Sequence, residues 1–341
     1  MTESNQEPIK VLVAMDFSDE IMQRLKDVSP RLQIERKFPN IAESEWEDVE
    51  ILYSARHFPE PEHAPRLRWI QLHSAGMEHM INKPIVQEAE DVEVTSSSGM
   101  HAIQMSEYCM AMMLAFMYQV PLMIERKRRV EWGEKPYQTF NPHGLRGQTL
   151  GIVGYGSIGR ELARIAHTMG MTVLASKRDL LGAVTDNGYY LQGTGDPEGD
   201  LPERFYPPEA VASMASECDF LVLAMPLTER TRHMINEDVF KAMPKSAYLI
   251  NVARGGVVDE DALISALASE EIAGAALDVF EQEPLPATSP LWNLDNVIIS
   301  PHVSGNTSNY HDKVADVFIE NLKRYLEKRP LLNVLNRTEG Y

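Results

Sequence analysis

The chain has 341 residues, enough for about two domains, and its composition of 44% hydrophobic and 24% charged residues is typical of a globular protein. Its formal net charge of -18 argues against a nucleic-acid partner or an anionic membrane, because no extended basic face could dominate the field. The polar residues 1–8 do not have the pattern of a signal peptide, and Cys109 and Cys218 lie in apolar stretches, as expected for buried free thiols in a reducing compartment. We therefore expect a cytoplasmic protein.

The first hundred or so residues predict a small α/β unit. An apolar strand pattern at 9–15 is followed by a helical pattern at 20–28, and further short strands are expected at 32–36, 51–53, 69–72 and 92–96. A long, methionine-rich helix is expected from about 101 to 130, with its methionines filling irregular gaps in the packing. Its most apolar part is too short and too polar for a membrane span.

A second α/β unit is expected to begin near residue 148. Strand patterns recur at 149–154, 171–176, 219–225, 248–252, 272–279 and 297–300, with helical patterns between them. Six strands with crossover helices predict a doubly wound parallel sheet. The glycine- and proline-rich segment 186–208 is predicted to be an irregular surface loop, long for an α/β connection. An amphipathic helix at 311–326 is expected to return to the first domain, which would make that domain discontinuous.

A glycine-rich turn at 154–159 lies between a strand pattern and a helix pattern, the context in which such a turn binds a dinucleotide. Gly154 permits the tight turn, Gly156 lets backbone amides approach a pyrophosphate, and Gly159 allows close packing of helix on strand. The phosphates would then lie on amides at the start of the helix, at Ser157 and Ile158.

The end of the second strand bears on the choice between NAD and NADP. An acidic residue about 20 positions after the first glycine usually accepts from the ribose 2′-hydroxyl of NAD. Here Ser176, Lys177 and Arg178 occupy this place, and no acid occurs until Asp179. Two cations and a hydroxyl would attract a 2′-phosphate, so NADP is favoured and NAD stays possible. The alternative is that both basic side chains lie in solvent.

Three residues lie at or just past the ends of strand patterns in the second unit: Arg254, Glu283 and His302. Because ligands bind outside the carboxyl ends of strands in an open α/β sheet, a guanidinium, a carboxylate and an imidazole should converge on one crevice. That set can bind an anion and move a proton. Taken singly, each residue also has a structural explanation, as an ion-pair residue, a solvated acid or a buried histidine.

Longer motifs surround these three residues. They run Asn251-Val-Ala-Arg254-Gly255-Gly256-Val-Val-Asp259, Leu277-Asp278-Val-Phe-Glu-Gln-Glu283-Pro284 and Val297-Ile-Ile-Ser-Pro301-His302, with Ser74-Ala75-Gly76, Ser98-Gly99 and Pro226-Leu-Thr228 upstream. Together they resemble the D-isomer-specific 2-hydroxyacid dehydrogenases, in particular those that act as glyoxylate or hydroxypyruvate reductases, over nearly the whole chain. The resemblance implies a Rossmann cofactor domain (108–302) inserted into a smaller, flavodoxin-like substrate domain (1–107 plus 303–341). It also implies an active site in the cleft between the domains and a homodimer built on the cofactor domain.

The roles of the three residues agree with this resemblance. Arg254 would bind the carboxylate of a 2-oxo acid and polarise its keto oxygen, and His302 would act as the general acid or base. Glu283 would orient the imidazole and stabilise its positive charge. By resemblance, the amides of Ala75 and Gly76 would hold the substrate carboxylate. The same resemblance implies further cofactor contacts at Pro226, Thr231, Val252, Ala253, Asp278 and Gly305. The wall that selects the substrate is expected in the first domain, at Tyr53, Leu72 or His73.

The predicted activity is reversible hydride transfer between NAD(P)H and a small 2-oxo acid, giving a D-2-hydroxy acid. Two alternatives stay open: a non-catalytic, nucleotide-sensing protein similar to the corepressors on this scaffold, and an enzyme similar to phosphoglycerate dehydrogenase. A formate dehydrogenase is disfavoured, because that relative is expected to carry glutamine where Glu283 stands. No metal is expected, since the other histidines lack zinc-ligand spacing.

Overall fold

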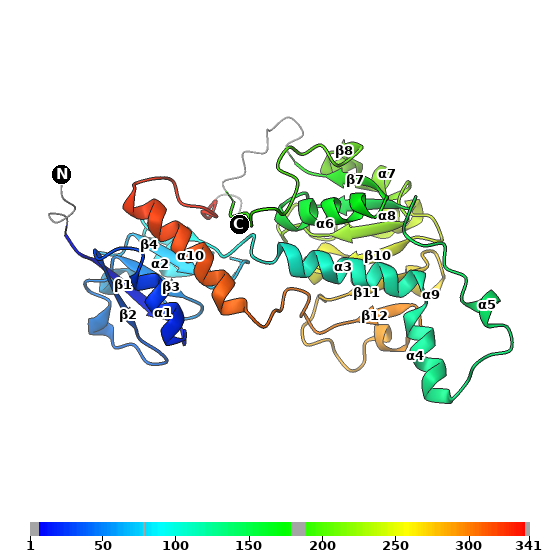
Figure 1. Cartoon of the computed structure of the whole chain (residues 1–341), viewed down its shortest axis with the longest axis horizontal. Helices are drawn as coiled ribbons and strands as arrows, with labels where there is room; N and C mark the ends of the chain where they lie inside the picture. The colour runs from blue at the N-terminus through cyan, green and yellow to red at the C-terminus, as the bar shows by residue number, and fades with distance from the viewer. Residues whose placement is uncertain (1–6, 78, 179–187, 338–341) are drawn as a thin grey trace. The chain divides into compact units, whose positions relative to one another are not determined.

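The computed structural model describes residues 7–77, 79–178 and 188–337. The chain divides into two compact units (Figure 1). Unit 1 comprises Met1–Met100, Asp186–Leu191 and Thr307–Tyr341, and unit 2 comprises His101–Thr185 and Gln192–Asn306. The domain boundaries expected from the sequence are 107/108 and 302/303. The structural boundaries differ from these because the whole of helix α3 packs on α6 in unit 2, and because the loop after the last strand stays bonded to that unit through residue 304.

Unit 1 contains a five-stranded parallel sheet in the order β2-β1-β3-β4-β5, the flavodoxin-like order that was predicted. The strands are β1 (Ile9–Ala14), β2 (Leu32–Arg36), β3 (Ile51–Ser54), β4 (Trp69–Leu72) and β5 (Glu93–Thr95). The helices are α1 (Asp19–Lys26), α2 (Pro84–Gln87) and α10 (Tyr310–Leu326), with short 3₁₀ turns η2 (Glu43–Glu45) and η3 (Pro61–His63).

The central strands β1, β3 and β4 are buried on both faces, which explains their mostly apolar runs, whereas the edge strand β2 alternates buried and exposed residues at its start. On β1, Val11 and Val13 point to the face covered by α1 and α10, and Leu12 and Ala14 point to the opposite cluster. In Figure 1, α10 lies beside α1, although nearly 300 residues separate them in sequence. Phe318 of α10 is fully buried on this face, and burial of such a side chain contributes about 1.5–3 kcal/mol.

Unit 2 contains a seven-stranded parallel sheet in the order β12-β11-β10-β9-β6-β7-β8. The strands are β6 (Thr149–Val153), β7 (Thr172–Ser176), β8 (Arg204–Tyr206), β9 (Phe220–Leu223), β10 (Tyr248–Asn251), β11 (Gly274–Leu277) and β12 (Val297–Ile299). Counted from β6, the first six strands have the dinucleotide-binding order 3-2-1-4-5-6, so the strand order reverses between β6 and β9.

Helices cover both faces of this sheet. One face carries α3 (Ala102–Met117) and α6 (Ser157–Thr168), and the other carries α7 (Val211–Ala215), α8 (Glu237–Ala242) and α9 (Glu260–Ala268). The remaining elements are α4 (Val120–Arg129), α5 (Pro136–Thr139), η4 (Pro208–Ala210), η5 (Gly255–Val257) and η6 (Pro290–Asn293). Asp259 caps α9 by accepting from the backbone N–H of Ala262 at 3.0 Å.

Two local predictions were wrong. The segment 186–208 is not wholly irregular, because Arg204–Tyr206 pairs with β7 as strand β8 and makes seven strands where six were expected. Three residues are too few for a strand pattern to show in the sequence. Residues 186 and 187 lie outside the described part of the chain.

The helix expected over 101–130 is two helices. Gln119 adopts a left-handed backbone, and a new helix begins at Val120, with Pro121 in its first turn because proline has no N–H to continue the preceding helix. Among the described residues, no single helix has both the length and the apolar composition to cross a membrane; α3 and α4 satisfy those criteria only as a pair, bent by 61°.

Candidate active site

The three residues singled out from the sequence follow neighbouring strands of the unit 2 sheet. Strands β10, β11 and β12 are adjacent and parallel, so their carboxyl ends lie at one edge. Arg254 follows β10, Glu283 follows β11 and His302 follows β12. The three residues therefore follow adjacent strand ends, and a shared site for them stays a prediction.

His302 and Glu283 are in direct contact. The imidazole Nδ1 lies 2.7 Å from the Oε2 of Glu283, while Oε1 of Glu283 accepts the backbone N–H of Phe280 at 3.0 Å. The carboxylate is therefore fixed at both oxygens, and it fixes the imidazole in turn. The side chains are 50% and 36% exposed, which leaves the other ring nitrogen of His302 accessible for proton exchange.

The backbone of His302 is held in an uncommon conformation. Its φ is +54°, in the left-handed region, which costs about 1–2 kcal/mol for a residue with a side chain. The fully buried Asp278 offsets this cost. Its carbonyl oxygen accepts the N–H of His302 at 2.8 Å, and its carboxylate accepts the N–H groups of Val303 and Ser304 at 2.8 and 2.9 Å.

Asp278 also accepts the hydroxyl of Ser300 at 2.5 Å, and Ser300 lies 2.7 Å from the hydroxyl of Tyr108 in α3. Burial raises the pKa of Tyr108 to about 12, so its hydroxyl stays protonated. This network was not predicted from the sequence, where Asp278 was assigned to the cofactor by resemblance. No local pattern indicates that a buried acid would bond three residues of a loop about 25 positions ahead.

Arg254 is positioned by a compact turn after β10. Asn251, almost fully buried, accepts the N–H of Ala253 at 3.0 Å and donates to the carbonyl oxygen of Arg254 at 3.3 Å. A Cβ on the next residue, Gly255, would lie 1.8 Å from the carbonyl carbon of Phe280. Glycine thus allows the turn that carries Arg254 to pack directly on the turn that leads to Glu283. Val252 and Ala253, expected at the cofactor, are both buried in this turn.

The glycine turn has the geometry that dinucleotide binding requires. Gly154 has φ +100°, and a Cβ there would lie 2.8 Å from the backbone of Ala224 just after β9. A Cβ on Gly159 would lie 2.3 Å from the carbonyl oxygen of Gly154. Around Gly156, by contrast, a Cβ would meet nothing within 4 Å. The outer glycines are needed for packing, and the middle one leaves open space beside the start of α6, where Ser157 and Ile158 follow.

The loop after β9 forms the other side of the point where the strand order reverses. Thr231 donates its hydroxyl to the carbonyl oxygen of Pro226 at 2.7 Å and accepts the N–H of Thr228 at 2.8 Å. Pro226 and Thr231, the two residues of this loop that the resemblance assigned to the cofactor, therefore belong to one hydrogen-bonded turn. Gly305 lies further along, with its carbonyl oxygen 3.1 Å from His101 Nδ1.

The end of β7 carries the residues expected to select the cofactor. Ser176 is buried and its carbonyl oxygen accepts the N–H of Gly154 at 3.0 Å, so strand end and glycine turn are joined. The Lys177 ammonium lies 4.8 Å from the centroid of the Phe205 ring. Arg178 is exposed, and Asp179 lies outside the described residues.

The residues expected at the substrate in the first domain belong to unit 1. Ala75 and Gly76 are half-buried after β4, where Ser74 donates its hydroxyl to the carbonyl oxygen of Gly76 at 2.8 Å. Tyr53 and Leu72 are fully buried, which removes them as wall residues. His73 is half-buried, with Nδ1 2.8 Å from the Tyr53 hydroxyl; burial and the neighbouring His311 lower its pKa to about 4.

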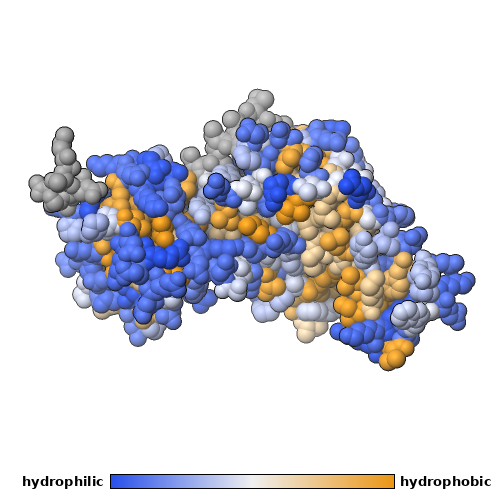
Figure 2. All heavy atoms as spheres, viewed as in Figure 1, coloured by the Kyte–Doolittle hydropathy of each residue, from blue (hydrophilic) through white to orange (hydrophobic). Residues whose placement is uncertain are grey.

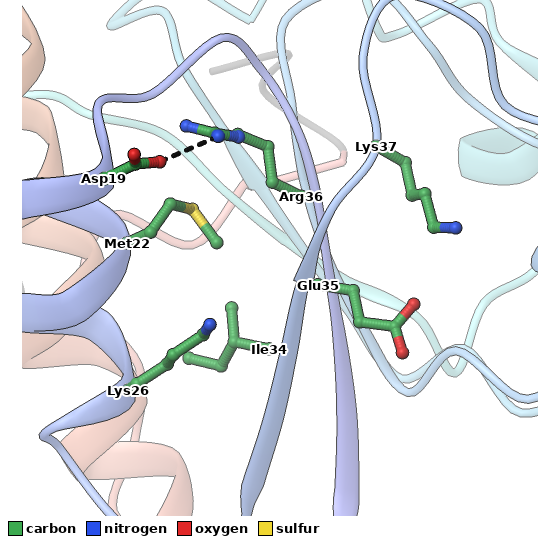
Figure 3. A pocket seen from close by; sticks show the side chains of 7 residues that line it. All are labelled: Asp19, Met22, Lys26, Ile34, Glu35, Arg36 and Lys37. Atoms are coloured by element: carbon green, nitrogen blue, oxygen red, sulfur yellow. Dashed lines mark hydrogen bonds and ion pairs between the residues drawn. The ribbon is translucent and has the colours of Figure 1, made fainter.

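A cleft of about 300 Å³ lies elsewhere in unit 1, between α1 and β2 (Figure 3). Its lining residues are Asp19, Met22, Lys26, Ile34, Glu35, Arg36 and Lys37. None of them is a predicted site residue, and Arg36 is paired with Asp19 at 2.8 Å across it. Among the described residues, no group of three or more His, Cys, Asp or Glu is placed to hold a metal ion.

Comparison with known proteins places these observations in a family. The family model described as the D-isomer specific 2-hydroxyacid dehydrogenase NAD-binding domain matches residues 110–304. A glyoxylate reductase of Thermofilum pendens is 33% identical over 76% of this chain and 72% of its own. An (S)-sulfolactate dehydrogenase of Chromohalobacter salexigens is 34% identical over 70% and 72% of the two chains.

A solved structure of a D-isomer specific 2-hydroxyacid dehydrogenase from Xanthobacter autotrophicus, in complex with NADPH and MES, is 26% identical. It covers 98% of this chain and 100% of its own, with a TM-score of 0.78. The family match thus includes the glycine turn and all three strand-end residues, and the sheet has the dinucleotide-binding strand order. The chain therefore belongs to the D-isomer specific 2-hydroxyacid dehydrogenases, a family of NAD(P)-dependent oxidoreductases.

Proposed function

We propose that this enzyme reduces a small 2-oxo acid, such as glyoxylate or hydroxypyruvate, to the corresponding 2-hydroxy acid, with the D configuration where that carbon is chiral and with NADPH preferred over NADH. The observation that carries the proposal is the 2.7 Å contact between His302 and Glu283 at the strand edge that also carries Arg254. This set supplies what the reduction of an anionic 2-oxo acid needs: a cation, a proton donor and a carboxylate that orients that donor.

The nicotinamide cofactor, when bound, supplies or accepts the hydride. The protein's part in reduction is to deliver a proton to the substrate oxygen as negative charge develops there. His302 fits this task, because its Nδ1 is bonded to Glu283 and its other nitrogen is left to donate. In the oxidative direction the same nitrogen takes the hydroxyl proton.

Arg254 would bind the substrate carboxylate and polarise the keto oxygen through its fork of donors. The amides of Ala75 and Gly76 would hold the same carboxylate. Because the chain has a formal net charge of -18, binding of an anionic substrate and an anionic cofactor depends on such local donors and cations.

Cofactor contacts are proposed along the edge of the sheet where the strand order reverses. The open space at Gly156 fits a pyrophosphate on the amides of Ser157 and Ile158. Lys177 and Arg178 at the end of β7 favour the 2′-phosphate of NADP, with Ser176 beside them. Pro226, Thr231, Val252, Ala253 and Gly305 complete the proposed set. Asp278, assigned to the cofactor by resemblance, belongs to the same proposed set, and its Oδ2 also accepts the N–H of Ser304.

Steady-state kinetics with NADPH and NADH over a panel of oxo acids test the proposal. The panel should include glyoxylate, hydroxypyruvate, a branched 2-oxo acid, 3-phosphohydroxypyruvate and sulfopyruvate, the last because one relative is named for sulfolactate. We expect reduction of a small oxo acid and a higher kcat/KM with NADPH. Cofactor binding without turnover of any oxo acid would favour the non-catalytic alternative, and turnover limited to 3-phosphohydroxypyruvate would favour the phosphoglycerate dehydrogenase alternative.

A homodimer is proposed through the region of α4 and α5. Figure 2 shows hydrophobic residues at the surface where α4 lies. The exposed apolar residues there are Tyr118, Val120, Met123, Ile124, Val130, Trp132 and Tyr137, and the last three of these are 92%, 87% and 91% exposed. A group of exposed apolar side chains of this kind usually marks a protein–protein interface. Light scattering of the parent and of an Ile124→Glu variant should distinguish a dimer from a monomer.

A cytoplasmic location is proposed from the two cysteines. Cys109 and Cys218 are free and buried. Burial raises the pKa of Cys218 to about 12 and that of Cys109 further, so both stay as unreactive thiols. Free thiols without a disulfide fit a reducing compartment.

A further inference from the structure

The segment 195–206 is hydrogen-bonded to α6, the helix that follows the glycine turn. Glu161 of α6 is 2% exposed, and such a buried carboxylate needs hydrogen-bond partners. It accepts the N–H of Gly195 at 2.7 Å and a bidentate pair from Arg164 at 2.6 and 2.9 Å. Part of the segment predicted as a long surface loop is therefore hydrogen-bonded, at Gly195, to the second turn of α6.

Asp196, 3% exposed, joins this segment to the glycine turn itself. Its Oδ2 accepts the hydroxyl of Tyr155 at 2.6 Å, and its backbone carbonyl accepts Arg160 Nη1 at 2.9 Å. Tyr155 lies between Gly154 and Gly156. Burial and the bond to Asp196 raise the pKa of the Tyr155 hydroxyl above its usual range, so it remains a donor.

Phe205 of β8 connects the same tyrosine to the end of β7. The rings of Tyr155 and Phe205 pack edge to face, with centroids 5.2 Å apart. The Lys177 ammonium lies 4.8 Å from the Phe205 centroid, within the range of cation–π attraction. Phe205 is paired with Ala175 in the sheet, so its position beside Lys177 is set by the backbone.

We propose that residues 195–206 form a second recognition element of the cofactor site, acting through two positioning residues. Asp196 holds Tyr155 and so fixes the glycine turn that both NADH and NADPH would use. Phe205 holds the Lys177 ammonium at the place where only NADPH has a 2′-phosphate. The inference rests on the cofactor site proposed above. It assigns to Asp196 an effect on the binding of both nucleotides, and to Phe205 an effect on the binding of NADPH alone.

Fluorescence titration of the full chain with NADPH and NADH, without oxo acid, tests both parts. Tyr155→Phe keeps the ring and removes the hydroxyl, so Kd should rise by a similar factor, roughly three- to tenfold, for both nucleotides. Phe205→Leu should raise Kd for NADPH by roughly two- to fivefold and leave Kd for NADH unchanged. In a Lys177→Met background, Phe205→Leu should have no further effect on NADPH.

Glu198→Gln is the matched control, because Glu198 is an exposed acid of the same segment. Thermal unfolding of every variant accompanies the titrations. Variants that lower Tm but keep the parental Kd for both nucleotides would show that the segment is only structural and overturn the inference. An equal change in Kd for NADH and NADPH in Phe205→Leu would overturn the proposed role of Phe205 in positioning Lys177. A parent chain that binds neither nucleotide would instead overturn the proposed function.

Discussion

The backbone N–H of His302 donates to the carbonyl oxygen of Asp278 at 2.8 Å, which ties the candidate proton donor to the buried end of the neighbouring strand β11. The Asp278 carboxylate bonds the two residues that follow His302, and Glu283 bonds its ring. Both the backbone and the side chain of His302 are thus held by residues after β11. This fixed geometry explains how an exposed histidine with left-handed φ can keep one orientation.

Replacement of His302 should affect catalysis more than binding. We expect His302→Ala to lower kcat by about 10²–10⁴, the contribution of a positioned general acid. Glu283→Gln keeps an acceptor near Nδ1 and should cost less. Stopped-flow measurement of NADPH oxidation gives the rates, with the exposed His143→Ala as control. Near-parental turnover by His302→Ala would refute its role as proton donor.

Arg254 should contribute to both substrate binding and turnover. Arg254→Ala removes the guanidinium that would pair with the substrate carboxylate, so KM for the oxo acid should rise by tenfold or more. That factor corresponds to about 1.4 kcal/mol or more of lost interaction. Arg254→Lys keeps the charge but not the planar fork, and it should recover only part of the loss. An unchanged KM in both variants would contradict the assignment.

The position of the loop that carries His302 should depend on Asp278 far more than on Ser300. Asp278→Asn removes the charge and replaces one acceptor oxygen with an NH₂ group, which faces backbone N–H groups or the Ser300 hydroxyl. We expect it to lower kcat at least tenfold and to cost about 1–3 kcal/mol of stability. Ser300→Ala leaves the two N–H bonds intact and should keep kcat within about threefold. Equal effects of the two variants would show that the N–H bonds do not position His302.

Cofactor preference should respond to Arg178. Arg178→Asp places an acid at the end of β7, where it can accept from a ribose 2′-hydroxyl and repel a 2′-phosphate. The ratio of kcat/KM for NADPH to that for NADH should fall by at least tenfold. The comparison variant is Arg230→Asp, in an exposed position after β9. If the ratio stays constant in Arg178→Asp, the residue does not face the ribose.

Stability at mildly acid pH should depend on His73. Its pKa is lowered to about 4 in the folded protein, against about 6.5 unfolded, so between these values the unfolded chain binds more protons. The contribution of His73 to the free energy of unfolding is therefore complete above pH 6.5. It falls by at most about 3 kcal/mol as the pH drops toward 4. Urea unfolding of His73→Gln should show a weaker loss of stability from pH 7 to pH 5 than the parent. Parallel pH curves for parent and variant would contradict this linkage.

The sequence by itself determined the features that depend on local patterns and strand order. Apolar runs located the strands, and the rule that ligands bind at carboxyl ends of parallel strands brought Arg254, Glu283 and His302 to one edge. The spacing of Gly154, Gly156 and Gly159 indicated a dinucleotide turn because each glycine has a separate steric reason.

Only the tertiary structure decided the features that depend on contacts between distant segments. Strand β8 is three residues long and exists because β7 offers an edge to pair with. Asp278 and Asp196 are buried acids whose partners include backbone N–H groups, and such groups have no sequence signature. Their roles follow from the need to satisfy a buried charge, and that need can be seen only once the fold has placed the donors around it.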